Sequence, residues 1–258
     1  MQDSDPRLQR ALDTWPLWNV QLSDAPRVIA PLGGGLSNSS WLLAMGDAKC
    51  VLRLNNQDHQ IWQIDRVAEY KIHRAVEAIG LAPEILHCDL STGFLVTRYI
   101  EGKVLSSRDL TDPVIGIDLA EAIQRFSQLD LNLPAFNYAK HLDRYVAVLR
   151  RLGGAVPDIL CRTIAAVEPE IKAFQSSDWR PCLVHHDLES RNIIQSDQGL
   201  KIIDWEYGAM GYGGMDLAVL GSRYTEPHAV VPALRELIND LWYLIEELAS
   251  DVAGTDPS

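Results

Sequence analysis

The stretch PCLVHHDLESRNIIQSDQGLKIIDWEYGAMGYGGMDLA, residues 181–218, decides the fold of this chain. It contains two short apolar runs with β character, 183–184 and 200–203, and each leads into a polar cluster. Residues 195–199 (QSDQG) read as a turn between these runs, so the stretch predicts a β-hairpin. The polar side chains at its strand ends are the candidates for chemistry.

Three of these side chains, Asp187, Asn192 and Asp204, could converge on one cleft. Asp187 and Asn192 are five residues apart in a loop, and Asp204 follows the next strand. Carboxylate and amide oxygens suit a hard cation, and Mg²⁺ is usually held by one or two carboxylates plus substrate phosphates. An acid that does not bind the metal can accept a hydroxyl proton. The pattern therefore favours a cation site with a general base beside it.

The stretch resembles the catalytic and metal loops of the kinase-like fold, in which His-x-Asp-x-x-x-x-Asn precedes a counterpart of Asp-Phe-Gly. The variant here, with His-His-Asp at 185–187 and Ile-Asp-Trp-Glu-Tyr at 203–207, resembles the aminoglycoside phosphotransferase and choline kinase family, in particular its small bacterial choline kinase-like and thiamine kinase-like members. A hairpin that merely carries acids at its turns is the alternative, and order, spacing and strand context together disfavour it. The resemblance covers essentially the whole chain.

The resemblance implies a bilobal, protein-kinase-like α+β fold. Its N-terminal lobe, an antiparallel sheet plus one helix that binds the nucleotide, is expected over residues 1–100. The C-terminal lobe, mostly helical with the catalytic hairpin and the substrate site, is expected over residues 101–258. A length of 258 residues is sufficient for two lobes with a real core.

Composition excludes several classes of partner. The net charge of −12 disfavours general nucleic-acid binding, which usually needs a basic face. No apolar run approaches the roughly 20 residues of a membrane helix, and the start MQDSD lacks the basic region of a signal peptide. The four cysteines have no Cys-x-x-Cys spacing, so neither a zinc site nor a disulfide framework is expected. We therefore expect a cytoplasmic protein, monomeric or homodimeric, that binds neither nucleic acid nor membrane.

Residues 27–54 read as three strands, with a glycine-rich stretch between the first two. Consecutive glycines let backbone N–H groups approach an anion, and neighbouring Ser and Asn side chains add donors. A plain hairpin turn is the alternative. Gly-Gly-Leu-Ser-Asn resembles the phosphate loop of choline kinase-like proteins, and no Gly-Lys-Ser/Thr follows as in a Walker A loop. The candidate phosphate-binding residues are Gly33, Gly34, Gly35, Ser37, Asn38 and Ser39.

Arg53 lies on the third strand, where protein kinases carry a lysine that holds the nucleotide phosphates. A guanidinium can also fork onto phosphate oxygens. Residues 61–79 predict an amphipathic helix, with Glu69 beside the apolar stripe and Arg66 on the polar side. The resemblance implies an ion pair between Arg53 and Glu69. The alternatives are a surface arginine on an edge strand and an exposed helix acid.

Strands are also expected at 85–88 and 93–100, and helices at 113–129, 141–152, 157–174 and 229–252. The resemblance implies that the adenine contacts the backbone near Thr97, Tyr99 and Ile100. Asp216 reads as a helix N-cap, and the resemblance implies that it supports the catalytic loop.

The resemblance implies phosphoryl transfer from ATP to a hydroxyl of a small molecule, with Asp187 as base and Asn192 and Asp204 on Mg²⁺. An acid with aromatic rings suits a cationic head, which favours choline, ethanolamine or thiamine as acceptor. The candidate acceptor-side residues are Glu206, Tyr207 and Trp242, and for the aromatic residues ordinary packing is the alternative. An aminoglycoside or amino-sugar phosphotransferase, and a catalytically inactive nucleotide-binding regulator, stay open as other functions.

Overall fold

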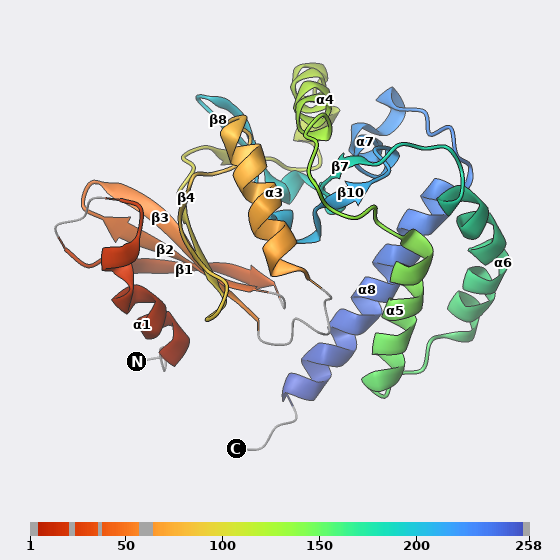
Figure 1. Cartoon of the computed structure of the whole chain (residues 1–258), viewed down its shortest axis with the longest axis horizontal. Helices are drawn as coiled ribbons and strands as arrows, with labels where there is room; N and C mark the ends of the chain where they lie inside the picture. The colour runs from red at the N-terminus through yellow and green to blue at the C-terminus, as the bar shows by residue number, and fades with distance from the viewer. Residues whose placement is uncertain (1–4, 21–23, 36–37, 57–63, 255–258) are drawn as a thin grey trace. The chain divides into compact units, whose positions relative to one another are not determined.

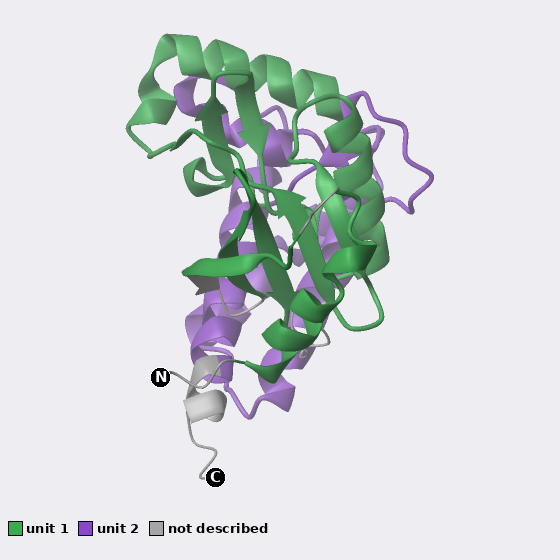
Figure 2. Cartoon of the chain, turned by 90° about the vertical axis from the view of Figure 1, so that its left-hand side faces the viewer, with its two compact units in different colours: residues 1–126, 187–208 green, residues 127–186, 209–258 purple. Residues whose placement is uncertain are grey.

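The computed structural model describes residues 5–20, 24–35, 38–56 and 64–254. Its internal contacts divide the chain into two compact units, residues 1–126 with 187–208, and residues 127–186 with 209–258 (Figure 2). The first unit is therefore assembled from two separate parts of the sequence. The expected lobes are defined by function instead, with nucleotide binding at 1–100 and catalysis and substrate binding at 101–258. That division stays a prediction.

The first unit contains a five-stranded antiparallel sheet with strand order β1-β2-β3-β5-β4 (Figure 1). The strands predicted at 27–54, 85–88 and 93–100 are confirmed. Gly46 turns the chain from β2 to β3 with a positive φ of 58°, which a residue without a side chain adopts at little cost. The strands are β1 (Arg27–Gly35), β2 (Asn38–Met45), β3 (Ala48–Asn55), β4 (Ile85–Asp89) and β5 (Phe94–Arg98).

The alternation of side chains along β3 separates the core of this sheet from the site. Cys50, Leu52 and Leu54 are buried in one apolar cluster together with residues of α1 (Pro6–Asp13) and with Trp18. Because successive side chains of a strand point to opposite faces, Arg53 lies on the other face. That face carries α3, which begins at residue 66.

Helix α3 (Arg66–Ala78) lies beside β4 and beside the short helix η4 (Trp205–Tyr207) (Figure 1). It begins after Asp65, whose carboxylate accepts hydrogen bonds from the backbone N–H groups of residues 67 and 68, both at 3.0 Å. The helix therefore starts later than the predicted residue 61, and residues 61–63 lie outside the described part. Glu69 and Ile72 are buried on the inner face.

The hairpin in the 181–218 stretch differs from the prediction in its first strand. It consists of β8 (Ile193–Ser196) and β9 (Gly199–Ile202), whereas β7 (Cys182–Val184) pairs with β10 (Ala209–Gly211) in the second unit. The sequence prediction joined residues 183–184 to 200–203 across the turn at 195–199, and it assigned no strand to residues 193–194. β6 (Lys103–Val104), which was not predicted, extends the hairpin to a three-stranded sheet.

Helix α4 (Pro113–Ser127) anchors the exit of the hairpin. The rings of Phe126 and Trp205 meet edge to face, with centroids 5.2 Å apart, and both side chains are completely buried. Lys201 adds a second link, because its ammonium donates to the Gly80 carbonyl at the end of α3 at 2.6 Å. The segment 199–208 is thus attached to the helix that carries Glu69.

The second unit is mainly helical. α8 (Val230–Gly254) packs against α5 (Tyr138–Arg151) and α6 (Asp158–Gln175), as Figure 1 shows. The helices predicted at 141–152, 157–174 and 229–252 are confirmed with small shifts at their ends. Short helical turns occupy Asp109–Thr111, Ser190–Asn192, Gly214–Leu217 (α7) and Ala218–Arg223. Within the described residues, every helix is too short or too polar to cross a bilayer.

Candidate active site

Asp216 fixes the backbone that leads into the catalytic loop. Its two carboxylate oxygens accept hydrogen bonds from the backbone N–H groups of His185, at 2.6 Å, and His186, at 3.0 Å. His186 has a positive φ of 65°, a conformation that costs energy for a residue with a side chain. The acid therefore holds a turn that the chain would not otherwise favour. Burial raises the pKa of Asp216 to about 6, against the opposing effects of His185 and of the two amides.

The expected N-cap role of Asp216 is wrong. α7 begins at Gly214, with Gly213 in the cap position, and Asp216 lies inside the helix. Its carboxylate is used for the amides before Asp187 instead of for the amides of its own helix. This is the kind of contact that the family resemblance implied for it.

His186 is held from a second side. The Tyr138 hydroxyl lies 3.0 Å from His186 Nε2, and it also accepts a hydrogen bond from the Tyr212 backbone N–H at 2.8 Å. Tyr138 is completely buried. Sequence reasoning missed Tyr138, because nothing in its local pattern distinguishes it from a core aromatic residue.

Asp187 and Asn192 are in contact within the loop. Asn192 Nδ2 donates to the Asp187 backbone carbonyl at 2.8 Å and to Asp187 Oδ2 at 3.0 Å. This arrangement leaves Asn192 Oδ1 as the atom that can bind a cation. Burial raises the pKa of Asp187 to about 6, although the nearby guanidinium of Arg191 opposes that shift. A carboxylate with such a pKa is mostly ionised at pH 7 and is a better proton acceptor than an ordinary aspartate.

Asp204 lies at the start of η4 and is the second described non-glycine residue with a positive φ, also 65°. The Ile203 backbone N–H before it donates to the Asn192 carbonyl at 2.9 Å, so the two candidate metal ligands are joined through the backbone. Burial and the charge of Glu206 raise the pKa of Asp204, and Arg53 offsets part of that rise. Its side chain keeps 37% of its surface exposed, so a ligand can reach it.

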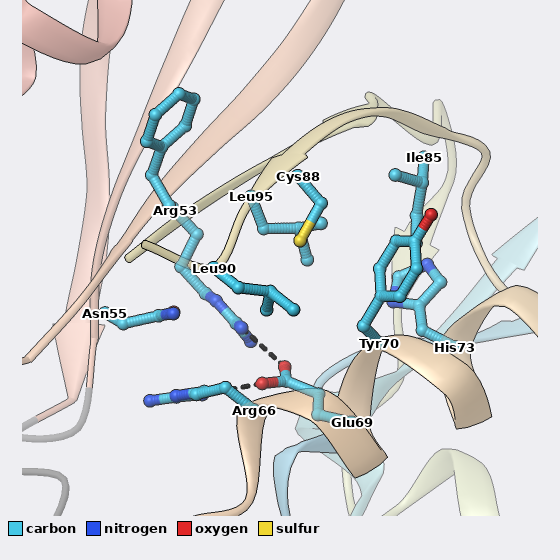
Figure 3. Close-up of a pocket in the computed structure, with 11 residues that line it drawn as sticks. Arg53, Asn55, Arg66, Glu69, Tyr70, His73, Ile85, Cys88, Leu90 and Leu95 are labelled. Atoms are coloured by element: carbon cyan, nitrogen blue, oxygen red, sulfur yellow. Dashed lines mark hydrogen bonds and ion pairs between the residues drawn. The ribbon is translucent and has the colours of Figure 1, made fainter. Parts of the chain in front are cut away.

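The ion pair predicted between Arg53 and Glu69 is present (Figure 3). Arg53 Nη2 lies 2.5 Å from Glu69 Oε1, and Arg53 Nη1 lies 3.4 Å from Asp204 Oδ1. The side chains of Arg53 and Glu69 are only 13% and 4% exposed, which excludes a surface arginine and an exposed helix acid. Burial alone would raise the pKa of Glu69, but the guanidiniums of Arg53 and Arg66 bring that pKa below its usual value.

Arg66 joins this network and was not anticipated as a site residue. Its Nη1 lies 2.8 Å from Glu69 Oε2 and 3.0 Å from Glu206 Oε2, and its Nη2 donates to Asn38 Oδ1 at 3.0 Å. Asn38 Nδ2 in turn donates to Glu206 Oε2 at 2.7 Å. Helical periodicity placed Arg66 on the polar face of its helix, but it could not show that this face meets other buried polar groups.

The three candidate acceptor-side residues belong to two different compact units. The Glu206 side chain is 3% exposed, and its carboxylate binds Asn38 and Arg66 inside the first unit. Tyr207 follows it in η4 and is half-buried. Trp242 belongs to the second unit, on α8, where its ring meets Tyr243 edge to face with centroids 5.2 Å apart. The contacts of Glu206 thus point to the ion network and not to a bound cation.

The candidate nucleotide-binding residues lie on or beside strands β1, β2 and β5 of the five-stranded sheet. Residues 33–35 end β1, and Gly35 pairs with Asn38 at the start of β2. Ser39 is the next residue of β2, and Ser37 lies outside the described part. Thr97 belongs to β5, and the Tyr99 N–H donates to the Lys49 carbonyl at 3.1 Å, with Ile100 directly after it.

A small cavity adjoins the Arg53–Glu69 pair, with about 260 Å³ of empty space that includes its open side (Figure 3). It is lined by residues of α3 and of β3 to β5. Arg53 Nε and Asn55 Oδ1 line it and are buried polar atoms without a hydrogen-bond partner among the described residues. A donor and an acceptor of this kind suit a bridging water.

The charges and donor atoms of the site fit Mg²⁺. The guanidiniums of Arg53 and Arg66 contact three carboxylates, and 2 − 3 leaves a charge of −1 when all three are ionised. The three acids are Glu69, Asp204 and Glu206, and Asp187 has the Arg191 guanidinium 3.8 Å away. Oxygen donors on Asn192 and Asp204 are of the type that Mg²⁺ prefers, together with phosphates and water. Among the described residues no group of three or more His, Cys, Asp or Glu side chains forms a self-sufficient metal site.

Comparison with known proteins gives a family and a fold. A model of the phosphotransferase enzyme family matches residues 28–248. Thiamine kinase of Shigella boydii is 36% identical over 69 residues, which are 27% of this chain and only 23% of that enzyme. The chain thus matches less than a quarter of the length of this relative.

Solved structures match over much more of the chain. A choline/ethanolamine kinase family protein from Mesorhizobium loti has a TM-score of 0.69 at 22% identity, covering 97% of this chain and 89% of that one. LicA, a choline kinase of Streptococcus pneumoniae, in complex with AMP has a TM-score of 0.72 at 21% identity, covering 93% and 90%. At these identities the likeness shows the fold alone, and it confirms the predicted kinase-like α+β fold.

Proposed function

This chain belongs to the phosphotransferase enzyme family, and from that premise we propose that it transfers the γ-phosphoryl group of ATP to a hydroxyl of a small molecule. The observation that carries the proposal is the position of Arg53. Its guanidinium contacts Glu69 at 2.5 Å and Asp204 at 3.4 Å, so it stands between a helix acid and a candidate metal ligand. A fixed, buried guanidinium of this kind suits the phosphates of a nucleotide bound with its metal.

In this proposal Asp187 is the general base. It orients the acceptor hydroxyl and takes its proton as the oxygen attacks the γ-phosphorus. The bond from the γ-phosphorus to the β–γ bridging oxygen breaks, and ADP leaves with that electron pair. Asn192 holds the Asp187 carboxylate in place through Nδ2, at 3.0 Å from Oδ2. Such a base contributes about 10²- to 10⁴-fold to the rate.

Asn192 Oδ1 and Asp204 would hold Mg²⁺, which when bound neutralises charge on the phosphates. The excess negative charge around Asp204 supports this assignment, since a cation would relieve the repulsion from Glu206 that raises the Asp204 pKa. The chain itself supplies the oxygen donors and the backbone link from Asn192 to Ile203 that keeps them together.

We assign the nucleotide to the candidate residues of the sheet. The phosphates would lie against Arg53 and the glycine-rich turn, whose members are Gly33, Gly34, Gly35, Ser37, Asn38 and Ser39. The adenine would contact the backbone near Thr97, Tyr99 and Ile100. The AMP bound to LicA, a protein of the same fold, supports nucleotide binding here.

The acceptor in this proposal is a small cationic alcohol of the choline, ethanolamine or thiamine type. The names of the relatives and fold neighbours support that class. Tyr207, in the first unit, and Trp242, in the second, each stay a separate candidate for an aromatic contact with its head group. Glu206 leaves this set, because its carboxylate is already bound by Asn38 and Arg66.

The test is ADP release with and without Mg²⁺ on a panel of choline, ethanolamine, thiamine, amino sugars and kanamycin. We expect Mg²⁺-dependent release with one of the first three acceptors. Release with amino sugars or kanamycin alone would assign the protein to the aminoglycoside class instead. Nucleotide binding without release on any acceptor would favour an inactive regulator, and no nucleotide binding at all would refute the proposal.

A further inference from the structure

Arg66 connects three parts of the first unit that carry different tasks in the proposed reaction. It contacts Glu69, the partner of Arg53, at 2.8 Å, and Glu206, two residues after Asp204, at 3.0 Å. It also donates to Asn38, the first residue after the glycine-rich turn to be described, at 3.0 Å. The phosphate-binding strand, the helix acid and the metal loop therefore meet at one guanidinium.

The position of Arg66 in its helix is unfavourable without these partners. It is the first residue of α3, directly after the capping Asp65. A cation near a helix N-terminus is repelled by the helix dipole, and the Arg66 side chain is only 14% exposed. The two carboxylates and the Asn38 amide offset both costs, so this arginine is fixed by the network and not by the helix.

The second contact between Asn38 and Glu206 closes the network. Asn38 Nδ2 lies 2.7 Å from the same Glu206 oxygen that contacts Arg66 at 3.0 Å. Arg66, Asn38 and Glu206 therefore form a ring of three mutual contacts. Asn38 is 8% exposed and the Glu206 side chain 3%, so water competes little for these bonds.

We propose that Arg66 is a positioning residue for the nucleotide, one that holds Asn38, Glu69 and Glu206 in a single arrangement. Through Glu69 it sets the direction of the Arg53 guanidinium (Figure 3). Through Glu206 it fixes the short helix η4, which follows Asp204 directly. This inference rests on the proposed function, since it assigns Arg66 to the nucleotide and metal side of the same site.

The alternative is that Arg66 only stabilises the fold. The chain offers a matched control, because Arg74 forms the same type of i, i+3 ion pair with Glu77 on the same helix, at 2.9 Å. The Arg74 side chain is 49% exposed, and Arg74 lies about two helical turns after Arg66. Such an exposed pair contributes little to stability.

The experiment measures binding of the fluorescent analogue mant-ATP in the presence of Mg²⁺ to the full chain, together with the melting temperature Tm. We expect Arg66→Met to raise the Kd about tenfold or more, because the loss leaves two buried carboxylates without their shared cation. Arg66→Lys keeps the charge but cannot reach all three partners, so its Kd should fall between wild type and Arg66→Met. Arg74→Met should leave the Kd within about twofold of wild type.

If Arg66→Met does not fold, Glu206→Gln tests the positioning role of Arg66 instead. It keeps the size of the side chain and weakens both contacts of the ring. We expect a higher Kd for mant-ATP and an unchanged KM for the acceptor. A raised acceptor KM with an unchanged nucleotide Kd would overturn the inference and return Glu206 to the substrate.

The outcomes separate this inference from the proposed function. Wild-type protein that fails to bind mant-ATP refutes both. Wild-type protein that binds it, with Arg66→Met or Arg66→Lys binding equally well, refutes only the positioning role. A lower Tm with an unchanged Kd also overturns it, because that result describes a purely structural arginine.

Discussion

Two residues of the site hold backbone conformations that side chains rarely adopt. His186 and Asp204 both have φ 65°, and they are the two described non-glycine residues in the left-handed region. His186 directly precedes Asp187, the proposed base. Asp204 is itself a proposed ligand of the metal. Strained backbone of this kind persists where surrounding contacts over-determine it, and the Asp216 carboxylate supplies such contacts at His186.

Replacement of the proposed base tests the mechanism at the residue scale. Asp187→Asn should lower kcat about 10²- to 10⁴-fold, because an amide cannot accept the hydroxyl proton. Its Kd for mant-ATP should stay within about threefold of wild type, since the base contacts the acceptor and not the nucleotide. Steady-state kinetics and a fluorescence titration measure the two quantities. Full turnover in this variant would exclude Asp187 as base.

Asp204→Ala tests the metal assignment. We expect turnover to be lost and nucleotide binding to become insensitive to Mg²⁺, because the main carboxylate ligand is gone. A titration of mant-ATP at several Mg²⁺ concentrations measures this. Arg74→Met is the control, and it should keep the Mg²⁺ dependence of the wild type. An unchanged Mg²⁺ dependence in Asp204→Ala would move the metal site elsewhere.

At the scale of elements, the contact between α4 and η4 holds the loop that carries Asp204. Phe126 and Trp205 are both completely buried and meet edge to face. Trp205 directly follows Asp204, so the packing of one residue sets the position of the next. The contact is made by side chains far apart in the sequence, and it lies within one compact unit.

Phe126→Ala should destabilise the protein by about 3–5 kcal/mol, the usual cost of deleting a buried aromatic side chain and leaving a cavity. Urea unfolding measures it. Val114→Ala on the same helix is the control, because Val114 is 65% exposed and its loss should change the free energy of unfolding by less than about 0.5 kcal/mol. Equal effects of the two substitutions would contradict the packing described here.

The contact between α7 and the backbone of His185 and His186 gives a second prediction for elements. Asp216→Ala removes the acceptor for two backbone N–H groups, and each lost bond to a charged group costs about 1.5–3 kcal/mol. We expect a lower free energy of unfolding and a lower kcat, because the turn before Asp187 loosens. Urea unfolding and kinetics measure both. Unchanged kcat in folded protein would show that the loop does not need this acid.

At the scale of the whole molecule, each compact unit contains a buried histidine whose pKa is lowered by burial. Burial lowers the pKa of His73 in the first unit, and its Nε2 lies 2.8 Å from the Pro83 carbonyl. Burial also lowers the pKa of His141 in the second unit to about 3, helped by the charge of His186. The folded second unit therefore does not bind a proton at His141 at mildly acidic pH.

His141 makes one contribution to the pH dependence of stability. Between the ordinary histidine pKa of 6.5 and the folded value of about 3, the unfolded chain binds a proton at His141 that the folded chain does not. This contribution destabilises the folded chain as the pH drops below 6.5, by at most about 1.4 kcal/mol per pH unit, whereas the raised pKa values of Asp187 and Asp216 act in the opposite direction. Relative to wild type, His141→Gln should therefore become more stable as the pH falls from 7 to 4, which urea unfolding measures. An unchanged difference from wild type over this range would show that His141 does not contribute.

The sequence by itself determined most of the secondary structure and the chemical identity of the site. Periodicity and turn residues located the strands of the sheet and the long helices, because these signals are local. The order of Asp187, Asn192 and Asp204 around a hairpin pointed to the kinase-like fold, and Arg53 and Glu69 were paired correctly through that resemblance.

Only the tertiary structure decided which polar groups meet. The partner of β7 is β10 and not β9, and Asp216 binds amides before Asp187 and does not cap its own helix. Arg66 and Glu206 come together across 140 residues of sequence. Local patterns report which face of an element is polar, but a buried ion network depends on what packs against that face. Which groups pack against a polar face depends on segments far apart in the sequence that folding brings together. Local patterns do not encode this information.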